Sequence, residues 1–287
     1  MTRAVVLSGG GPVGIGWHSG MVAAFSEAGI GVAAADLFVG SSAGAVVGAQ
    51  IALGRKPLDE MNRIVEVRPA SGYANAIGDN MQRLMTLMAS SDDMDPTERL
   101  RKLGELSLEA QVAPEENFVR RFEHLATDGW PERFVCTAID TADGAFTVWD
   151  ADANVDPARA VASSCSVPGF FPPITIHGRR YMDGGLRSIT NADLAAGHDR
   201  VLILTLFEPP RDSDDPRAVR VRKVLDAELD QIASKGGTSL VFAPDEEAQA
   251  VIGVNLMDPT RAKDAADAGY AQGQRVAERV GELWDEG

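Results

Sequence analysis

The clearest chemical signal in the sequence is the segment GSSAG at residues 40–44, which places Ser42 between Gly40 and Gly44. In this G-x-S-x-G spacing the serine occupies a tight turn from a strand into a helix, and the glycines let neighbouring backbone approach without a clash. An apolar run ends at Val39 and a run of small residues follows, as a strand and a helix would. The pattern predicts that Ser42 is a nucleophile, although a tightly packed glycine turn without chemistry has the same sequence.

A second glycine-rich segment, GGGPVG at residues 9–14, follows the apolar run Ala4–Leu7 and precedes a helical pattern. Successive N–H groups in such a turn form an anion-binding concavity, which an ester hydrolase needs for its tetrahedral oxyanion. Gly9, Gly11 and Gly14 also fit the G-x-G-x-x-G fingerprint of dinucleotide-binding proteins, which requires an acidic residue at the end of the second strand. That strand ends in glycine and serines, so the oxyanion role is favoured and nucleotide binding stays as an alternative.

A nucleophilic serine needs a base, and the histidines are poorly placed to act as one. In α/β-hydrolases the histidine comes last in the chain, but no histidine follows His198. Asp183 ends a short apolar segment and precedes Gly184 and Gly185, which present its carboxylate on a turn. Because Asp-Gly-Gly is also an ordinary turn sequence, Asp183 becomes the candidate base only together with the other two segments. The remaining histidines are His18, His124 and His177.

These three segments, in this order, resemble the patatin-like phospholipase family, which has a glycine-rich loop after its first strand, then G-x-S-x-G, and a distant D-G-G. The segment SSCSVPGFFPP at residues 163–173 resembles the family's Pro-Gly-Phe-Pro-Pro segment ahead of D-G-G. The resemblance implies a three-layer α/β/α sandwich with a largely parallel central sheet. It also implies a Ser–Asp dyad without histidine, in which Ser42 is the nucleophile and Asp183 the base.

By the same resemblance, the backbone N–H groups of Gly10 and Gly11 are the expected oxyanion donors, and Gly9 completes the loop. No metal and no organic cofactor is expected. The chain departs from the family where Val13 stands in place of the common Arg or Lys. Without that cation, and with a strongly negative chain, we expect neutral or zwitterionic esters to be preferred to anionic phospholipids. Arg187, after the D-G-G segment, is expected on the surface or in a salt bridge.

The alternation of apolar runs and helical patterns is typical of an α/β protein whose sheet is largely parallel. Strands are expected at residues 4–7, 36–39, 134–139, 146–149, 174–176, 180–182, 201–207 and 251–255, and helices after residues 14 and 44 and over 217–235 and 261–284. The stretch from about residue 55 to residue 130 has amphipathic helical patterns and little strand signal. We therefore expect one hydrolase domain over residues 1–287 that carries a helical insertion.

An apolar stripe at helical spacing lies within that insertion. It consists of Met81, Leu84, Met85, Leu87 and Met88. Flexible thioethers suit an acyl-chain pocket or a lid, but ordinary core packing is favoured, because helical periodicity by itself reports burial.

The composition is that of a globular chain with a strongly acidic balance. Of its 287 residues 45% are hydrophobic, and 42 Asp and Glu against 27 Lys and Arg give a net charge of −15. Such a surface repels nucleic acids and anionic membranes, so nucleic acid is excluded as a partner and only transient contact with a lipid surface is expected. The runs Asp92–Asp95 and Asp212–Asp215 lack the calcium-loop pattern. They are expected to form solvated turns.

No apolar segment fits a signal peptide, and none reaches the roughly 18 residues of a membrane span. The sequence therefore predicts a cytoplasmic protein in which Cys136 and Cys165 are reduced.

The resulting hypothesis is a serine acyl hydrolase of the patatin-like type that cleaves carboxylic esters of lipids, as a phospholipase A, a lysophospholipase or an esterase does. The alternatives are a catalytically silent binding protein on the same fold and a nucleotide-binding α/β protein, because a fold does not determine a function. The sequence does not indicate the acyl-chain length, the head group or the oligomeric state.

Overall fold

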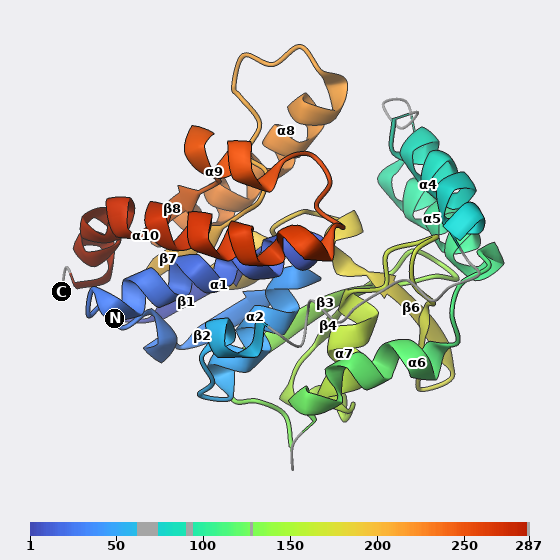
Figure 1. The fold of residues 1–287 in the computed structure, drawn as a ribbon, viewed down its shortest axis with the longest axis horizontal. Helices are drawn as coiled ribbons and strands as arrows, with labels where there is room; N and C mark the ends of the chain where they lie inside the picture. Colours follow the sequence, from blue (N-terminus) through green and yellow to red (C-terminus); the bar gives the residue numbers. More distant parts are fainter. Residues whose placement is uncertain (62–73, 90–93, 127–128, 286–287) are drawn as a thin grey trace.

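A computed structural model of the chain describes residues 1–61, 74–89, 94–126 and 129–285, and its centre is an eight-stranded sheet between helices (Figure 1). Five strands are parallel and lie in the order β3-β2-β1-β7-β8: β3 (Phe134–Asp140), β2 (Leu37–Gly40), β1 (Arg3–Leu7), β7 (Arg200–Leu204) and β8 (Thr238–Phe242). Three antiparallel strands extend the sheet beyond β3: β4 (Phe146–Trp149), β6 (Arg179–Asp183) and β5 (Ile174–Ile176).

The helices connect and cover these strands. They are α1 (Gly11–Glu27), α2 (Ala43–Ala52), α4 (Ala74–Ala89), α5 (Pro96–Glu109), α6 (Glu115–Val119), α7 (Pro157–Ser164), α8 (Pro216–Ser234), α9 (Glu246–Ile252) and α10 (Ala262–Asp285). Short 3-10 helices lie between them, among which η3 (Arg120–Leu125) and η6 (Ala192–Ala195) matter for the site.

The sheet is covered on both faces, which is visible in the alternation of side chains along β1. Val5 and Leu7 belong to a core cluster shared with α1, α2, α7 and α10. Ala4 and Val6 point the other way and join a second cluster with η6 and α8. A continuous apolar strand is what burial on both faces requires. The α/β fold with three layers and a largely parallel sheet, as predicted, is confirmed.

Within the predicted helical insertion, the described residues form helices and loops, among them α4, α5, α6 and η3; residues 62–73 lie outside the described residues. The methionine stripe lies on α4 and packs mainly into a third core cluster with α5 and the ends of β3 and β6. Leu84 is buried there against Leu103 and Ile139, whereas Met85 is half exposed. The stripe is therefore a core-facing helix surface, as its periodicity favoured.

Asp95 and Asp215, the last residues of the two acidic runs, lie at helix starts. Asp95 accepts hydrogen bonds from the N–H groups of Thr97 and Glu98 at the start of α5, and Asp215 caps α8 in the same way. A carboxylate at this position satisfies backbone donors that have no partner within the helix. Asp92 and Asp93 lie outside the described residues. Among the residues that are described, no group of three or more acidic, His or Cys side chains could hold a metal ion, and no helix is both long and apolar enough for a membrane span.

The prediction of a strand over residues 251–255 is wrong. Ile252 ends α9, whose start is capped by Asp245 through the N–H of Ala248. Gly253 has a φ of +66° and ends the helix. The last strand of the sheet is instead β8, which pairs in parallel with β7 from Thr238 to Phe242. A short apolar run by itself fits a strand or a helix equally well. Here the N-cap at Asp245 favours the helix.

Helices α1 and α10 lie side by side across one face of the sheet (Figure 1). Glycines let their backbones approach closely. A Cβ on Gly20 of α1 would lie 2.0 Å from the carbonyl oxygen of Ala266, and one on Gly269 of α10 would lie 2.3 Å from that of Trp17. Because backbone atoms form both contacts, neither helix can yield by a side-chain rotation. Helix α10 is thereby held directly against the helix that begins at the glycine-rich loop.

We predict that Gly20→Ala destabilises the protein by at least about 1–3 kcal/mol, the usual range for an overpacked core. Gly281→Ala in α10 is the matched control, because the nearest atom to its added Cβ is 4.0 Å away; alanine should raise stability there by up to about 1 kcal/mol. Urea denaturation of both variants measures the two effects. Equal stability of the two variants would contradict the close helix contact.

Candidate active site

Ser42 stands on a strained turn between β2 and α2. Its backbone has a φ of 53° and a ψ of −117°, which is a costly conformation for a residue with a side chain. The turn lies against the end of β1, because a Cβ on Gly44 would be 1.9 Å from the carbonyl oxygen of Leu7. The N–H of Gly44 also donates to the carbonyl of Ser8 at 3.0 Å. The second glycine of the motif is thus required by close backbone approach.

The sheet brings Asp183 to this turn from 141 residues further along the chain. Gly40 of β2 is paired with Cys136 of β3, and Ala138 of β3 is paired with Asp183 at the end of β6. The ends of β2 and β6 therefore pair with β3 at positions two residues apart. A Cβ on Gly184 would lie 2.1 Å from the Thr137 hydroxyl oxygen, so the residue after the aspartate also has no room for a side chain.

The Asp183 carboxyl group is 5% exposed. Burial raises its pKa from 3.8 to about 6, and hydrogen bonds from the Ser42 hydroxyl and the Gly185 N–H oppose the rise. The Gly185 N–H donates to Asp183 Oδ1 at 2.8 Å. The structure therefore brings together the two residues that the sequence singled out as nucleophile and base, with the serine hydroxyl against the carboxylate.

The glycine-rich loop passes next to Ser42. A Cβ on Gly9 would be 3.5 Å from Cβ of Ser42, and the Gly9 N–H donates to the carbonyl of Ile189 at 3.3 Å. Among the described residues, no backbone hydrogen bond occupies the N–H groups of Gly10 and Gly11. Gly11 is also the first residue of α1. A helix start with unoccupied N–H groups attracts negative charge.

Residues near the C-terminus hold this loop in place. Gly11 has a φ of +57°, and a Cβ there would be 2.6 Å from the carbonyl oxygen of Leu256 and 2.8 Å from the sulfur of Met257. The N–H of Val13 donates to the same Leu256 carbonyl at 3.3 Å. The Val13 side chain is completely buried in the core. A Lys or Arg side chain at position 13 would therefore be buried away from water, whereas the valine packs into the core.

The turn at Ser42 is supported on its other side by the end of α7. The Ser42 N–H donates to the hydroxyl of Ser164 at 2.9 Å, and the Cys165 thiol donates to the Ser42 carbonyl at 3.3 Å. Burial, together with the nearby Asp183 carboxylate, holds the pKa of Cys165 well above its ordinary value. Cys165 and Cys136 are both free thiols. The segment 163–173, which includes the Pro-Gly-Phe-Phe-Pro-Pro run, thus contacts the candidate nucleophile directly.

Three histidines lie in positions that do not suit a base for Ser42. His18 is completely buried, its Nε2 lies 3.0 Å from the Ser8 carbonyl, and burial lowers its pKa to about 4. His177 and His198 lie in turns and contact the carbonyls of Ala153 and Ala195.

His124 lies elsewhere, in a cavity that Ser42 also lines. Its Nδ1 lies 3.1 Å from the carbonyl of Arg121. Sequence reasoning did not place His124 near the serine, because nothing in the local pattern shows that η3 folds against α2 and α7.

The cavity over Ser42 is mostly apolar. Its lining comes from α1, α2, α6, η3, the segment after α7 and the loop before α10: Gly11, Pro12, Ile15, Ser42, Ala43, Val46, Gln50, Phe118, Arg121, Phe122, His124, Cys165, Val167, Phe171 and Met257. Two starting helices, α1 at Gly11 and α2 at Ala43, open onto it. The candidate nucleophile therefore faces an apolar space with helix N-termini at its base.

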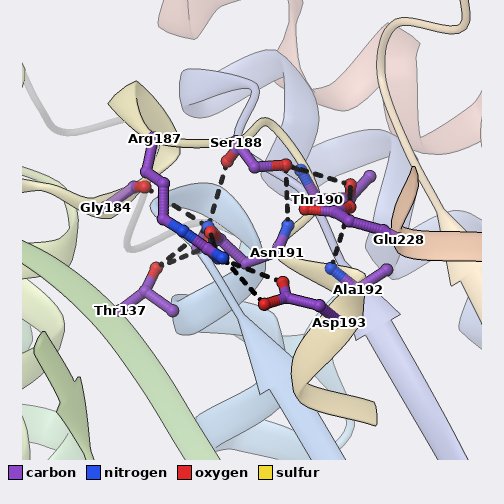
Figure 2. A network of polar contacts seen from close by, with 10 residues as sticks. Thr137, Gly184, Arg187, Ser188, Thr190, Asn191, Ala192, Asp193 and Glu228 are labelled. Carbon is purple, nitrogen blue, oxygen red and sulfur yellow. Dashed lines mark hydrogen bonds and ion pairs between the residues drawn. The ribbon is translucent and has the colours of Figure 1, made fainter. Parts of the chain in front are cut away.

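A buried polar network around Asn191 joins the Ser42 turn to the Asp183 turn, and Figure 2 shows Asn191 in it with Thr137 and Gly184. The side-chain amide of Asn191 donates to the Ser41 hydroxyl at 2.9 Å and to the carbonyl of Gly184 at 3.3 Å. Ser41 in turn shares a hydrogen bond of 2.7 Å with Thr137 of β3. Sequence reasoning missed Asn191, whose contacts depend on residues up to 150 positions away.

The same network is anchored by charged residues around the Asn191 loop (Figure 2). Glu228 of α8 is 3% exposed and accepts hydrogen bonds from the Thr190 hydroxyl and the Ala192 N–H, while burial raises its pKa. Arg187 forms an ion pair with Asp193 at 2.8 Å. The salt bridge expected for Arg187 is therefore present.

The fold and the site together define the class of protein: a three-layer α/β/α sandwich with a serine on a strand–turn–helix. A family model identifies the family within that class. The model for patatin-like phospholipase matches residues 5–196, and the chain belongs to the patatin-like phospholipase family. The match covers the glycine-rich loop, the Ser42 turn and the Asp183 turn. No curated protein matches the chain in sequence.

Two solved structures are similar to the chain. VipD from Legionella pneumophila has a TM-score of 0.47 and 15% identity, over 97% of this chain and 67% of that one. The type III effector protein ExoU has a TM-score of 0.42 and 17% identity, over 97% of this chain and 53% of that one.

Burial of Asp183 predicts an unusual pH dependence of stability. Its pKa of about 6 in the folded protein exceeds the ordinary 3.8, so the stability tied to its proton is complete below about pH 4 and is lost as the pH rises through about 6. Asp183→Asn is neutral at every pH. It should therefore be more stable than the wild type at about pH 7.5, by up to about 3 kcal/mol for a shift of two pKa units, and lose this advantage at about pH 4.

Urea denaturation of both proteins at the two pH values measures the difference, in which all other titrating groups cancel. A variant that is less stable than the wild type at the higher pH would contradict a buried charge at Asp183.

Proposed function

We propose that the protein hydrolyses carboxylic ester bonds of lipids through a Ser42–Asp183 dyad. The observation that supports this proposal most is the Ser42 hydroxyl, held on a strained turn against the buried Asp183 carboxylate and facing an apolar cavity. A serine becomes a nucleophile when an adjacent base takes its proton. The family match supports the same class of reaction.

In the proposed mechanism Asp183 accepts the proton of Ser42 as the hydroxyl oxygen attacks the ester carbonyl. The N–H groups of Gly10 and Gly11 hold the oxyanion of the tetrahedral intermediate, and the start of α1 adds its dipole. The alcohol leaves with the proton from Asp183. A water molecule, deprotonated by the same carboxylate, then attacks the acyl-enzyme, and Asp183 returns that proton to the Ser42 oxygen as the acid is released. Every proton in this cycle moves through one carboxyl group.

The substrate class follows from the cavity and its surroundings. Aliphatic and aromatic side chains form most of the lining, which favours an acyl chain over a polar group. Val254 is fully exposed on the loop that leads to Leu256 and Met257 at the glycine-rich loop. An exposed apolar side chain three residues before the cavity-lining Met257 supports transient contact with a lipid surface. Phospholipase A, lysophospholipase and esterase activity all fit this arrangement.

Two alternatives make different predictions. A silent binding protein would leave Ser42 unreactive toward a fluorophosphonate probe. Nucleotide binding requires an acidic residue at the end of the second strand, but β2 ends at Gly40 and leads into Ser42. The geometry therefore does not favour a nucleotide at the glycine-rich loop.

We predict that Ser42→Ala abolishes hydrolysis of p-nitrophenyl esters and defined phospholipids, while the protein stays folded. Ser41→Ala is the matched control. Its hydroxyl contacts Thr137 and Asn191 rather than the cavity, so this variant should keep substantial activity and lose about 1 kcal/mol of stability. Activity assays with a thermal melt for each variant separate the two effects. Equal loss of activity in both folded variants would rule out Ser42 as the nucleophile.

The identity of the base needs its own comparison. Because burial raises the pKa of Asp183 to about 6, the acid limb of the rate profile falls near the ordinary pKa of a histidine, about 6.5, and cannot distinguish the two groups. Asp183→Asn should lower kcat/KM by at least about 100-fold, the lower end for loss of a general base. His124→Asn and His18→Asn should lower it far less. An equal loss in folded His124→Asn would make the histidine the base.

A further inference from the structure

The cavity over Ser42 is lined by a cation that belongs to none of the three sequence segments singled out for the site. Arg121 lies on η3, and it is the one Arg, Lys, Asp or Glu among the described residues that line the cavity. Its guanidinium carbon is 5.4 Å from the ring centroid of Phe118 and 5.7 Å from that of Phe171. These rings stack on each other, with centroids 4.3 Å apart. The guanidinium is thus held against an aromatic pair in the wall of the cavity.

Arg121 forms no ion pair within the described residues, in contrast to three other partly buried arginines. Arg159 pairs with Glu115 at 2.7 Å, Arg187 with Asp193 at 2.8 Å and Arg222 with Glu208 at 3.1 Å. Within the described residues no such ion pair forms at Arg121, and burial lowers the pKa of its guanidinium. In a chain with a net charge of −15, carboxylates are abundant. As far as the described residues go, none of these carboxylates pairs with Arg121, which leaves the guanidinium donors available to a ligand.

A partly buried charge without a counter-charge costs free energy. Cation–π contacts with aromatic rings offset part of that cost. These contacts involve the flat face of the guanidinium and leave its edge free. The guanidinium edge carries five N–H donors in a fork that matches the oxygens of a carboxylate or a phosphate. An anionic oxygen entering the cavity would therefore find a preformed partner. A purely apolar acyl chain would leave the charge of the guanidinium without a counter-charge.

We propose that Arg121 is a specificity residue that binds an anionic oxygen of the substrate, a carboxylate or a phosphate, while the ester carbonyl lies at Ser42. The inference rests on the proposed hydrolase function. It departs from the preference for neutral esters expected from Val13, because the cation is supplied from η3 and not from the glycine-rich loop. The acidic surface still repels anionic membranes, so the preference concerns the single substrate molecule in the cavity.

The experiment compares matched monomeric substrates that differ in charge. One pair is p-nitrophenyl hexanoate and mono-p-nitrophenyl adipate, which adds a carboxylate at the end of the same chain. The other pair is a short-chain 1-acylglycerol and its 3-phosphate, which adds a phosphate on the alcohol side. The ratio of kcat/KM for the anionic to the neutral member is measured for each protein. The pair with the larger dependence on Arg121 identifies the source of the anion.

Arg121→Gln should lower this ratio by about 10-fold or more, through a higher KM for the anionic member, because a hydrogen bond to a charged group contributes about 1.5–3 kcal/mol. Arg121→Lys should recover part of it. Arg120→Gln is the matched control, since it removes the same charge from an exposed neighbour that contacts Glu116 and Asn117 outside the cavity. A ratio unchanged by Arg121→Gln in both pairs would overturn the proposal.

A binding measurement tests the role of Arg121 without requiring that an ester is hydrolysed. Calorimetric titration of the Ser42→Ala protein with hexyl phosphate, and separately with hexanoate, should give affinities that fall by about 10-fold or more when Arg121→Gln is added. Equal affinities with and without Arg121→Gln would overturn the proposal even if no ester is cleaved. Loss of Ser42-dependent hydrolysis for every substrate, with binding that depends on Arg121, would instead refute the proposed hydrolase function alone.

Discussion

The close approach of the Ser42 turn to the end of β1 is the constraint on which the site depends. Gly44 leaves no space for a side chain between itself and the Leu7 carbonyl, and its N–H donates to the next carbonyl along, that of Ser8. This contact joins the two glycine segments, because Ser8 leads directly into the glycine-rich loop. The backbone of the candidate nucleophile and that of the candidate oxyanion loop are therefore set relative to each other by this contact between the start of α2 and the end of β1. Any loosening here would separate both groups at once.

The local parts of the site could be predicted from the sequence, and the distant parts could not. The glycine segments each follow a strand and begin a helix within a few residues, so pattern and turn chemistry were sufficient to place Ser42 and Gly9–Gly11. Asp183 emerged from its two glycines and from the family resemblance. Arg121, His124 and Asn191 carry no local signal. They reach the site through the packing of η3 on α7 and through hydrogen bonds across as many as 150 residues.

The segment beyond the family match also shapes the site. Residues after 196 contribute β7, which pairs with the central strand β1, and α10, which packs on α1 through the glycine contacts at Gly20 and Gly269. Between them, the carbonyl of Leu256 and the sulfur of Met257 lie where a side chain on Gly11 would be. The apolar run 251–255, which sequence analysis wrongly assigned to a strand, lies in this region, and so does β8, which it did not predict. The first residues of this run complete the helix that the cap at Asp245 begins, and Leu256 and Met257, which contact the glycine-rich loop, come directly after the run.

The thiol of Cys165 has a consequence for how the site can be addressed by covalent reagents. It lies in the same cavity as Ser42 and donates to the serine's carbonyl, with its pKa held well above the ordinary value by burial and by the Asp183 carboxylate. Because the thiolate is the reactive form of cysteine, soft electrophiles such as maleimides meet a protonated, slow thiol at neutral pH. Hard electrophiles that mimic an ester carbonyl or a phosphoryl centre meet the Ser42 hydroxyl, with the Asp183 carboxylate beside it. The Ser42 oxygen and the Cys165 sulfur thus differ in reactivity although they share one cavity. The hardness of a covalent reagent can therefore determine which of the two it modifies.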